Sequence, residues 1–271
     1  MVKKLLKQEF KYYVTTVPFI VITVLGLGVL NWAVQFFEST SWVYNLIISS
    51  STTMLALGIA AASVLSIVLV IVRFYKNMFT AEGYLTFTLP VSNAQHILVK
   101  LLAGVAVQSL VLVSIISTIP IVLSGVTYKV VWGELFGMVA RELVDVLGVF
   151  NTILYTLELL LIFFTSLSST VLSYYACMTV GQMAKKNRIL LSIGCYFGLN
   201  AVSQVVGTVL SIILLILSEA GALEALGVLM SKYPIFSLHA IFLITALIGA
   251  AISTGWFFLI KWLMTKKLNL E

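Results

Sequence analysis

Long apolar segments alternate with short polar ones along the whole chain. A transmembrane helix needs about 20 consecutive apolar residues to cross the hydrocarbon core of a bilayer. Six segments are long enough, and the pattern predicts one spanning helix in each. The predicted spans are residues 17–37, 46–72, 97–123, 153–182, 189–217 and 236–264. We therefore expect an all-α integral membrane protein, with residues 1–271 forming a single transmembrane domain.

The stretch before the first predicted span is amphipathic. On a helix over residues 2–13, with 100° per residue, apolar side chains fall on one face and lysines on the other. The apolar face holds Val2, Leu5, Leu6, Phe10 and Tyr13, and the basic face holds Lys4, Lys7 and Lys11. Such a helix lies in the membrane interface, and we expect one within residues 1–16. The basic start of a signal peptide is the alternative. The long apolar run that follows has no small-residue cleavage site, and this favours a retained span.

Two further segments mix apolar and acidic residues at helical spacing. Residues 127–150 precede the fourth predicted span, and residues 218–233 precede the sixth. We expect each to form a short helix that lies on the outer face of the membrane or dips into it.

Composition agrees with a membrane location and excludes a soluble domain. Of the 271 residues, 61% are hydrophobic and 10% are charged, against roughly 25% charged in an ordinary soluble domain. The formal net charge is +6. In a chain this apolar, the positive charge belongs to the membrane topology and does not indicate nucleic-acid binding.

Lysine and arginine are divided unevenly between the two sides of the predicted spans. If the N-terminus is cytoplasmic, six spans return the C-terminus to the cytoplasm as well. Only Lys129, Arg141 and Lys232 then lie outside, and the other 13 of the 16 basic residues lie inside. Positive charge concentrates on the cytoplasmic side of membrane proteins, so the count supports both the six spans and cytoplasmic termini.

The segment between the second and third predicted spans, residues 73–95, carries the most information. Gly83 interrupts its helical pattern, and Pro90 pushes the preceding residue away from helical angles. Ser92 and Gln95 have the S-x-x-Q spacing of a capping box, which predicts the start of the next helix. A patterned segment of this kind suits docking of a soluble partner. An ordinary connection between two spans is the alternative.

Two short motifs in this segment resemble a known family. Residues 82–86 read EGYLT and residues 88–92 read TLPVS. This sequence is similar to the segment beside the coupling helix of bacterial ABC exporter permeases of the type-2 class. The resemblance implies a cytoplasmic coupling segment over residues 73–95 that docks an ATPase. The docking residues that it implies are Phe79, Glu82, Gly83, Tyr84 and Leu85.

The resemblance also implies partners and a transport activity. The chain lacks the G-x-x-x-x-G-K-[ST] loop that cradles nucleotide phosphates, so ATP and Mg²⁺ would bind a separate ATPase subunit, present in two copies. This chain itself would bind no cofactor. It would pair with a second permease subunit, as a homodimer or with a paralogue, in a bacterial plasma membrane. The pair would export a hydrophobic or amphipathic cargo (a peptide, an antibiotic or a lipid) by alternating access.

Few polar side chains lie inside the predicted spans. Glu158 is the one acid that we place in a span, and intramembrane acids often serve function. A position near the interface is the alternative. Asn200 and Gln204 share one helix face, which fits either a polar cargo path or interhelical hydrogen bonds. His239 stands alone in the sequence of the sixth span, which argues against a metal site.

Three other classes of function are alternatives to the exporter. A stand-alone secondary transporter would use an ion site within the spans, and Glu158 is the candidate for it. An intramembrane enzyme would need a motif such as HExxH or GxSxG, and the sequence has neither. A membrane component of an uptake system also stays open.

Overall fold

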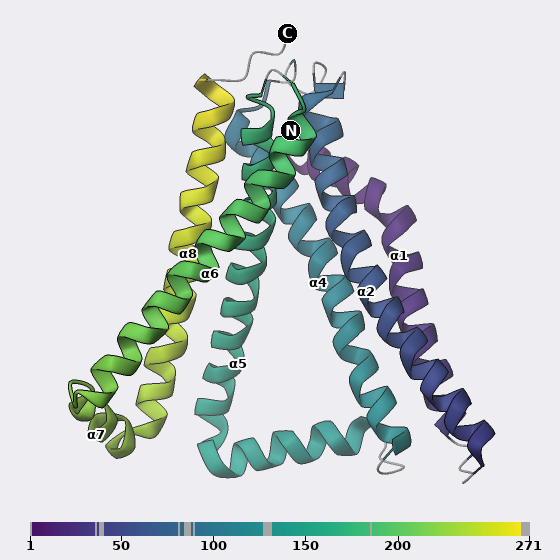
Figure 1. Ribbon diagram of the computed structural model, residues 1–271, viewed down its shortest axis with the longest axis vertical. Helices are drawn as coiled ribbons and strands as arrows, with labels where there is room; N and C mark the ends of the chain where they lie inside the picture. The colour runs from purple at the N-terminus through teal and green to yellow at the C-terminus, as the bar shows by residue number, and fades with distance from the viewer. Residues whose placement is uncertain are drawn as a thin grey trace. The chain divides into compact units, whose positions relative to one another are not determined.

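The computed structural model describes residues 2–35, 37, 41–80, 82–83, 88, 90–126, 132–184 and 186–266. Within these residues the regular structure is helical throughout, with seven helices and no strand (Figure 1). The helices are α1 (Val2–Gln35), α2 (Trp42–Phe79), α4 (Asn93–Val126), α5 (Trp132–Gly181), α6 (Arg188–Glu219), α7 (Glu224–Lys232) and α8 (Pro234–Lys266).

Six of the described helices are long and apolar enough to cross a membrane. The qualifying stretches are Val2–Gln35, Trp42–Phe79, Asn93–Ile119, Gly137–Gly181, Arg188–Glu219 and Pro234–Thr265. Each contains or largely coincides with one predicted span, in the same order. For the described residues, the prediction of an all-α fold with six helices long and apolar enough to span a membrane is confirmed.

Helix α1 differs from the prediction at its start. It runs without a break from Val2 to Gln35 and includes Pro18, so no separate interfacial helix ends before the first span. The residues of the predicted basic face, Lys4, Lys7 and Lys11, are all exposed. On the predicted apolar face, Val2, Leu5 and Leu6 are half-buried, Tyr13 is 4% exposed and Phe10 is 36% exposed. The buried stripe of α1 instead recurs every three or four residues, as one face of a helix does. It comprises Glu9, Tyr13, Val17, Ile20, Val24, Gly28, Asn31 and Gln35.

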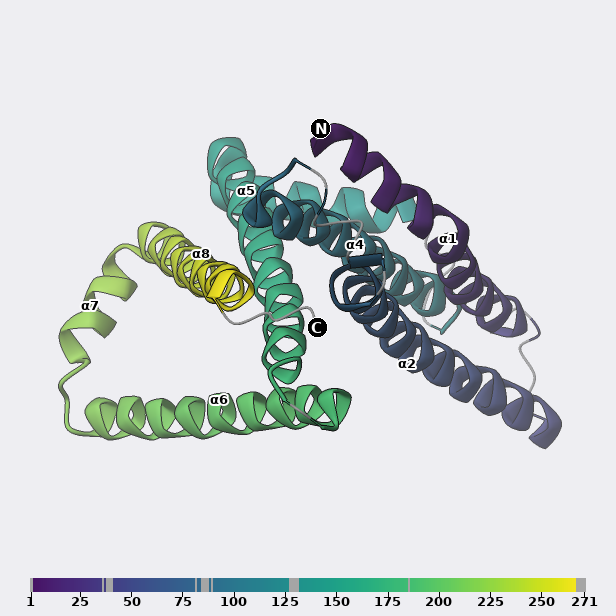
Figure 2. The ribbon, with the colours of Figure 1, turned by 90° about the horizontal axis from the view of Figure 1, so that it is seen from above.

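Residues 1–145 form one compact unit in which α1 packs along α4 and α2 (Figures 1 and 2). Polar side chains join these helices. Asn31 on α1 donates to the hydroxyls of Ser51 and Thr52 on α2, at 3.0 Å each. Ser66 on α2 lies 3.2 Å from the amide oxygen of Gln108 on α4. Interhelical hydrogen bonds of this kind fix the register of packed helices in an apolar medium.

Residues 146–271 form the second unit, which contains most of α5 and all of α6, α7 and α8. Ser253 on α8 donates to the Thr165 carbonyl on α5 at 3.2 Å. The tyrosine rings of Tyr174 on α5 and Tyr196 on α6 lie 5.4 Å apart. Beyond its start, α6 is exposed, and Figure 2 shows most of it running apart from α8.

Short helices precede the fourth and sixth spans, as the sequence predicted. Helix α5 is broken at Gly148, whose φ of 78° and ψ of 155° are not helical. A residue with positive φ is tolerated best as glycine, so Gly148 separates the short helix that begins at Trp132 from the span. Helix α7 is the second short helix. Their location at the outer face stays a prediction.

Candidate functional site

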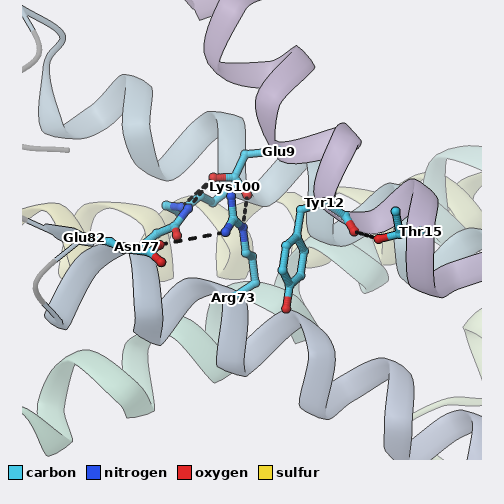
Figure 3. Close-up of polar contacts among 7 residues, drawn as sticks. All are labelled: Glu9, Tyr12, Thr15, Arg73, Asn77, Glu82 and Lys100. Carbon is cyan, nitrogen blue, oxygen red and sulfur yellow. Dashed lines mark hydrogen bonds and ion pairs between the residues drawn. The ribbon is translucent and has the colours of Figure 1, made fainter. Parts of the chain in front are cut away.

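Charged and polar side chains from three helices converge on Glu9 of α1 (Figure 3). The Glu9 carboxylate accepts hydrogen bonds from Arg73 Nε at 3.0 Å and from Asn77 Nδ2 at 2.7 Å, both on α2. It also accepts one from Lys100 Nζ on α4 at 2.9 Å. We call these four residues the Glu9 network.

The Glu9 network is almost dry. The side chains of Glu9, Lys100 and Arg73 are 9%, 5% and 13% exposed. Buried ions need both a counter-charge and hydrogen bonds to offset the loss of hydration, and here Glu9 supplies both to two cations. The Tyr12 ring adds to this, because the Arg73 guanidinium carbon lies 4.3 Å from its centroid.

Helical spacing explains how the network is assembled. Residues four apart lie on the same face of a helix, so Arg73 and Asn77 both point from α2 toward α1. On α4, His96 and Lys100 have the same spacing and are both buried. The network therefore joins the beginning of α1, the end of α2 and the beginning of α4.

The network extends to the predicted coupling segment through Glu82. A carboxylate oxygen of Glu82 lies 4.0 Å from Arg73 Nη1, and its side chain is 60% exposed. The following Gly83 is buried and donates from its backbone N–H to the Thr80 carbonyl at 2.7 Å. A Cβ at Gly83 would lie 2.8 Å from the Met78 carbonyl oxygen. Only glycine allows the backbone to come this close to Met78. This close approach keeps the neighbouring Glu82 beside the end of α2.

The other predicted docking residues are placed only in part. Phe79 ends α2 and packs its ring against Phe74 and Tyr75 of its own helix, with centroids 5.6 and 6.2 Å apart. Tyr84 and Leu85 lie outside the described residues.

The predicted capping box is confirmed at the start of α4. Gln95 N–H donates to Ser92 Oγ at 3.4 Å, and Ser92 N–H donates to Gln95 Oε1 at 3.2 Å. The segment between α2 and α4 therefore ends in a reciprocal cap. The cap stands one to two turns before Lys100 of the Glu9 network.

A second polar cluster lies in the other unit. His239 Nδ1 on α8 is 2.9 Å from both carboxylate oxygens of Glu158 on α5. The Glu158 side chain is 10% exposed and that of His239 is 16% exposed. Our interpretation of His239 as an isolated residue was therefore wrong. The two residues are 81 positions apart, and only the packing of α5 on α8 brings them together.

Aromatic rings hold His239 in place. The Tyr155 ring stacks on the imidazole, with centroids 4.0 Å apart and planes at 7°. The Tyr155 hydroxyl donates to the Ile235 carbonyl at 2.9 Å, and Phe242 meets the same ring edge-on at 5.7 Å. The hydroxyl of Tyr155 is therefore hydrogen-bonded to the backbone, and its ring packs against the imidazole.

Asn200 and Gln204 are both exposed on α6. The Asn200 amide donates to the Tyr196 carbonyl of its own helix at 2.8 Å. In the part of the chain that the structure describes, no hydrogen bond joins either residue to Glu158. Their role in a cargo path stays a prediction.

Sequence reasoning missed the Glu9 network. The sequence around Glu9 gives no local sign of a buried partner, because the partners of Glu9 are 64 to 91 positions away. One signal was present, because Glu9 is the single acid among the first 37 residues. If the face that carries this acid becomes buried when the helix packs, the carboxylate needs a cation from another helix beside it.

Comparisons of the chain with protein-family models, with curated proteins and with solved structures each found no match. Within the described residues, no group of three or more His, Cys, Asp or Glu side chains is arranged to hold a metal ion.

Proposed function

We propose that this chain is the membrane-spanning permease subunit of an ATP-driven exporter of the type-2 ABC class. The observation that carries the proposal is the Glu9 network. It ties both ends of the segment between α2 and α4, together with α1, into one buried cluster, and Glu82 of the EGYLT motif reaches that cluster through Arg73.

The network gives the segment a mechanical role. A soluble ATPase pressing on the exposed Glu82 region would act on the end of α2, because Gly83 packs against the Met78 backbone. The buried ion pairs resist separation, since parting them would leave charges without compensation in an apolar medium. The push would therefore move α1, α2 and α4 together. Concerted movement of packed helices is how domain motion opens and closes a transport path.

The proposal assigns the remaining tasks to partners. Two copies of a separate ATPase subunit bind ATP and Mg²⁺, and a second permease subunit faces this one across the cargo path. The complex resides in a bacterial plasma membrane with both termini of this chain in the cytoplasm. The cargo is hydrophobic or amphipathic, because the chain offers mostly apolar side chains at membrane depth.

Purification from the native membrane tests the class. The tagged chain would be isolated in mild detergent, its co-purifying subunits weighed and the ATPase activity of the eluate measured. We expect a soluble-type ATPase to co-purify and to cross-link to a photoreactive residue placed at Tyr84. A preparation that contains no ATPase in any mild detergent contradicts the proposal.

Replacing Glu82 or Tyr84 by alanine is expected to uncouple transport from ATP hydrolysis. Because the Glu82 side chain is 60% exposed and the three donors to Glu9 are other residues, we expect Glu82→Ala to keep the hydrogen bonds of Glu9 and to leave membrane insertion unchanged. Reconstituted complexes should show a several-fold loss of cargo moved per ATP hydrolysed. Glu219→Ala, at an exposed acid ending α6, is the matched control. Equal coupling in Glu82→Ala and Glu219→Ala would remove the docking assignment.

The Glu158–His239 pair favours a second candidate, a stand-alone secondary transporter. A buried acid paired with histidine in a span is the type of group that binds coupling ions in such proteins. Transport by the purified chain in vesicles that contain no ATPase, driven by an ion gradient alone, would identify this function.

A further inference from the structure

The cluster of Glu158, His239 and Tyr155 has the features of a binding site for one positive charge. Its three side chains come from two helices of one unit and are locked by the contacts described above. The proposed mechanism of ATPase coupling does not use it, since that mechanism runs through the Glu9 network in the other unit.

The hydrogen-bond capacity of Glu158 is largely unused. An ionised carboxylate has about four acceptor sites. Among the described residues, the one group that donates to Glu158 is the imidazole, through Nδ1. Tyr155 packs against the pair, but its hydroxyl donates to Ile235 instead. A ligand with several N–H donors would satisfy the acceptor sites that remain.

The other nitrogen of His239 is a second polar atom that the cluster leaves unsatisfied. His239 Nε2 is buried and has no hydrogen-bond partner among the described residues. Buried polar atoms are almost always hydrogen-bonded, so one without a partner marks a place where a ligand can add a contact. A cation bound at Glu158 would also supply the counter-charge that a buried carboxylate requires.

We propose that the Glu158 carboxylate binds the ammonium group of an amphipathic primary amine. The three N–H donors of the ammonium complete the acceptor sites of Glu158, and its charge compensates that of the carboxylate. The alkyl part has apolar surface beside it, because Leu161, one turn after Glu158, and Leu243, one turn after His239, are 49% and 47% exposed. As a statement about cargo, this inference names the substrate class of the proposed exporter and rests on that function.

The same ammonium chemistry occurs in free amines and in the headgroup of phosphatidylethanolamine. Both sources pair a primary ammonium with a long apolar chain. A binding experiment can separate them, because only the lipid would already occupy the site in a membrane that contains it.

The test measures binding of radiolabelled octylammonium to the purified full chain in phosphatidylcholine nanodiscs. We expect saturable binding to one site per chain, and at least about tenfold weaker binding of octanol and octyltrimethylammonium, which lack the charge or the N–H donors. Octanol binding as tight as octylammonium would overturn the proposal without any variant being needed.

Variants then assign the site. Glu158→Gln removes the charge at nearly constant shape and should weaken binding by about tenfold or more. His239→Gln keeps an amide donor and should retain binding, since the carboxylate holds the ligand. Glu219→Gln is the control for removing an exposed acid. Binding by Glu158→Gln equal to that of the wild-type chain would refute the assignment.

A second set of nanodiscs contains phosphatidylethanolamine. Competition between this lipid and octylammonium would assign the site to the headgroup, and unchanged binding would assign it to free amines. The assay uses neither ATP nor a partner subunit. Absence of octylammonium binding would contradict the ammonium site and would not affect the proposal that an ATPase docks. Absence of a co-purifying ATPase would contradict that proposal and would not affect the ammonium site.

Discussion

Glu9→Ala is expected to lower the unfolding free energy of the chain by about 3–5 kcal/mol, the usual effect of removing one partner from a buried ion pair. The Lys100 side chain is 5% exposed, so its ammonium would stay in an apolar environment without the carboxylate that now compensates it. Arg73 would lose the same partner. Thermal unfolding of the detergent-solubilised protein, followed by loss of helical circular dichroism, would measure the change.

Two further variants identify the cause. Lys7→Ala alters an exposed charge on the same helix and should leave stability nearly unchanged. In Glu9→Ala/Lys100→Met, both the carboxylate and the ammonium are absent, and we expect part of the lost stability to return because no ammonium is left to compensate. If Glu9→Ala is as stable as Lys7→Ala, the network does not hold α1, α2 and α4 together.

Gly181→Ala is expected to destabilise the turn between α5 and α6 by about 1–3 kcal/mol, as overpacking usually does. A Cβ at Gly181 would collide with Ser192 Oγ and lie 2.7 Å from the Arg188 carbonyl oxygen. Ser192 Oγ donates to that same carbonyl at 3.0 Å, so rotating the hydroxyl away would break a hydrogen bond. Moving the Arg188 carbonyl would shift the first turn of α6.

Gly194→Ala is the matched control, because a Cβ there meets nothing within 4 Å. It should be neutral or slightly stabilising, since alanine favours a helix over glycine. The measurement is the midpoint of thermal unfolding, which should be lower for Gly181→Ala than for Gly194→Ala. Similar midpoints would mean that α5 and α6 do not approach each other closely at Gly181.

The architecture could be predicted largely because it depends on local sequence. Length and apolarity alone identify a span, so the six spans emerged in the right order. The cap at Ser92 and Gln95 was also predictable, because both of its hydrogen bonds join residues three positions apart. The continuity of α1 was not predicted, since a change from amphipathic to apolar pattern does not require a break in the backbone.

The polar clusters could not be predicted because they depend on how distant helices pack. Whether Glu9 faces water or Lys100 is decided by the rotation of α1 against α4, and a difference of one residue turns a helix by about 100°. The pairing of Glu158 with His239 depends on the register between α5 and α8 in the same way. Periodicity identifies the face on which a residue lies, but it does not identify the helix that the face contacts.

The proline within α1 determines how far a movement at one end of that helix is felt at the other. With a rise of about 1.5 Å per residue, its 34 residues extend about 51 Å, which exceeds the roughly 30 Å of hydrocarbon in a bilayer. Pro18 has no N–H to donate to the Val14 carbonyl, so the bending stiffness of the helix is lowest near its middle. Helix α1 therefore consists of two stiff halves that can bend relative to each other at a flexible joint at Pro18. One half carries Glu9 and the other carries Asn31, and the stiffness of the joint sets the fraction of an angular displacement that passes between them.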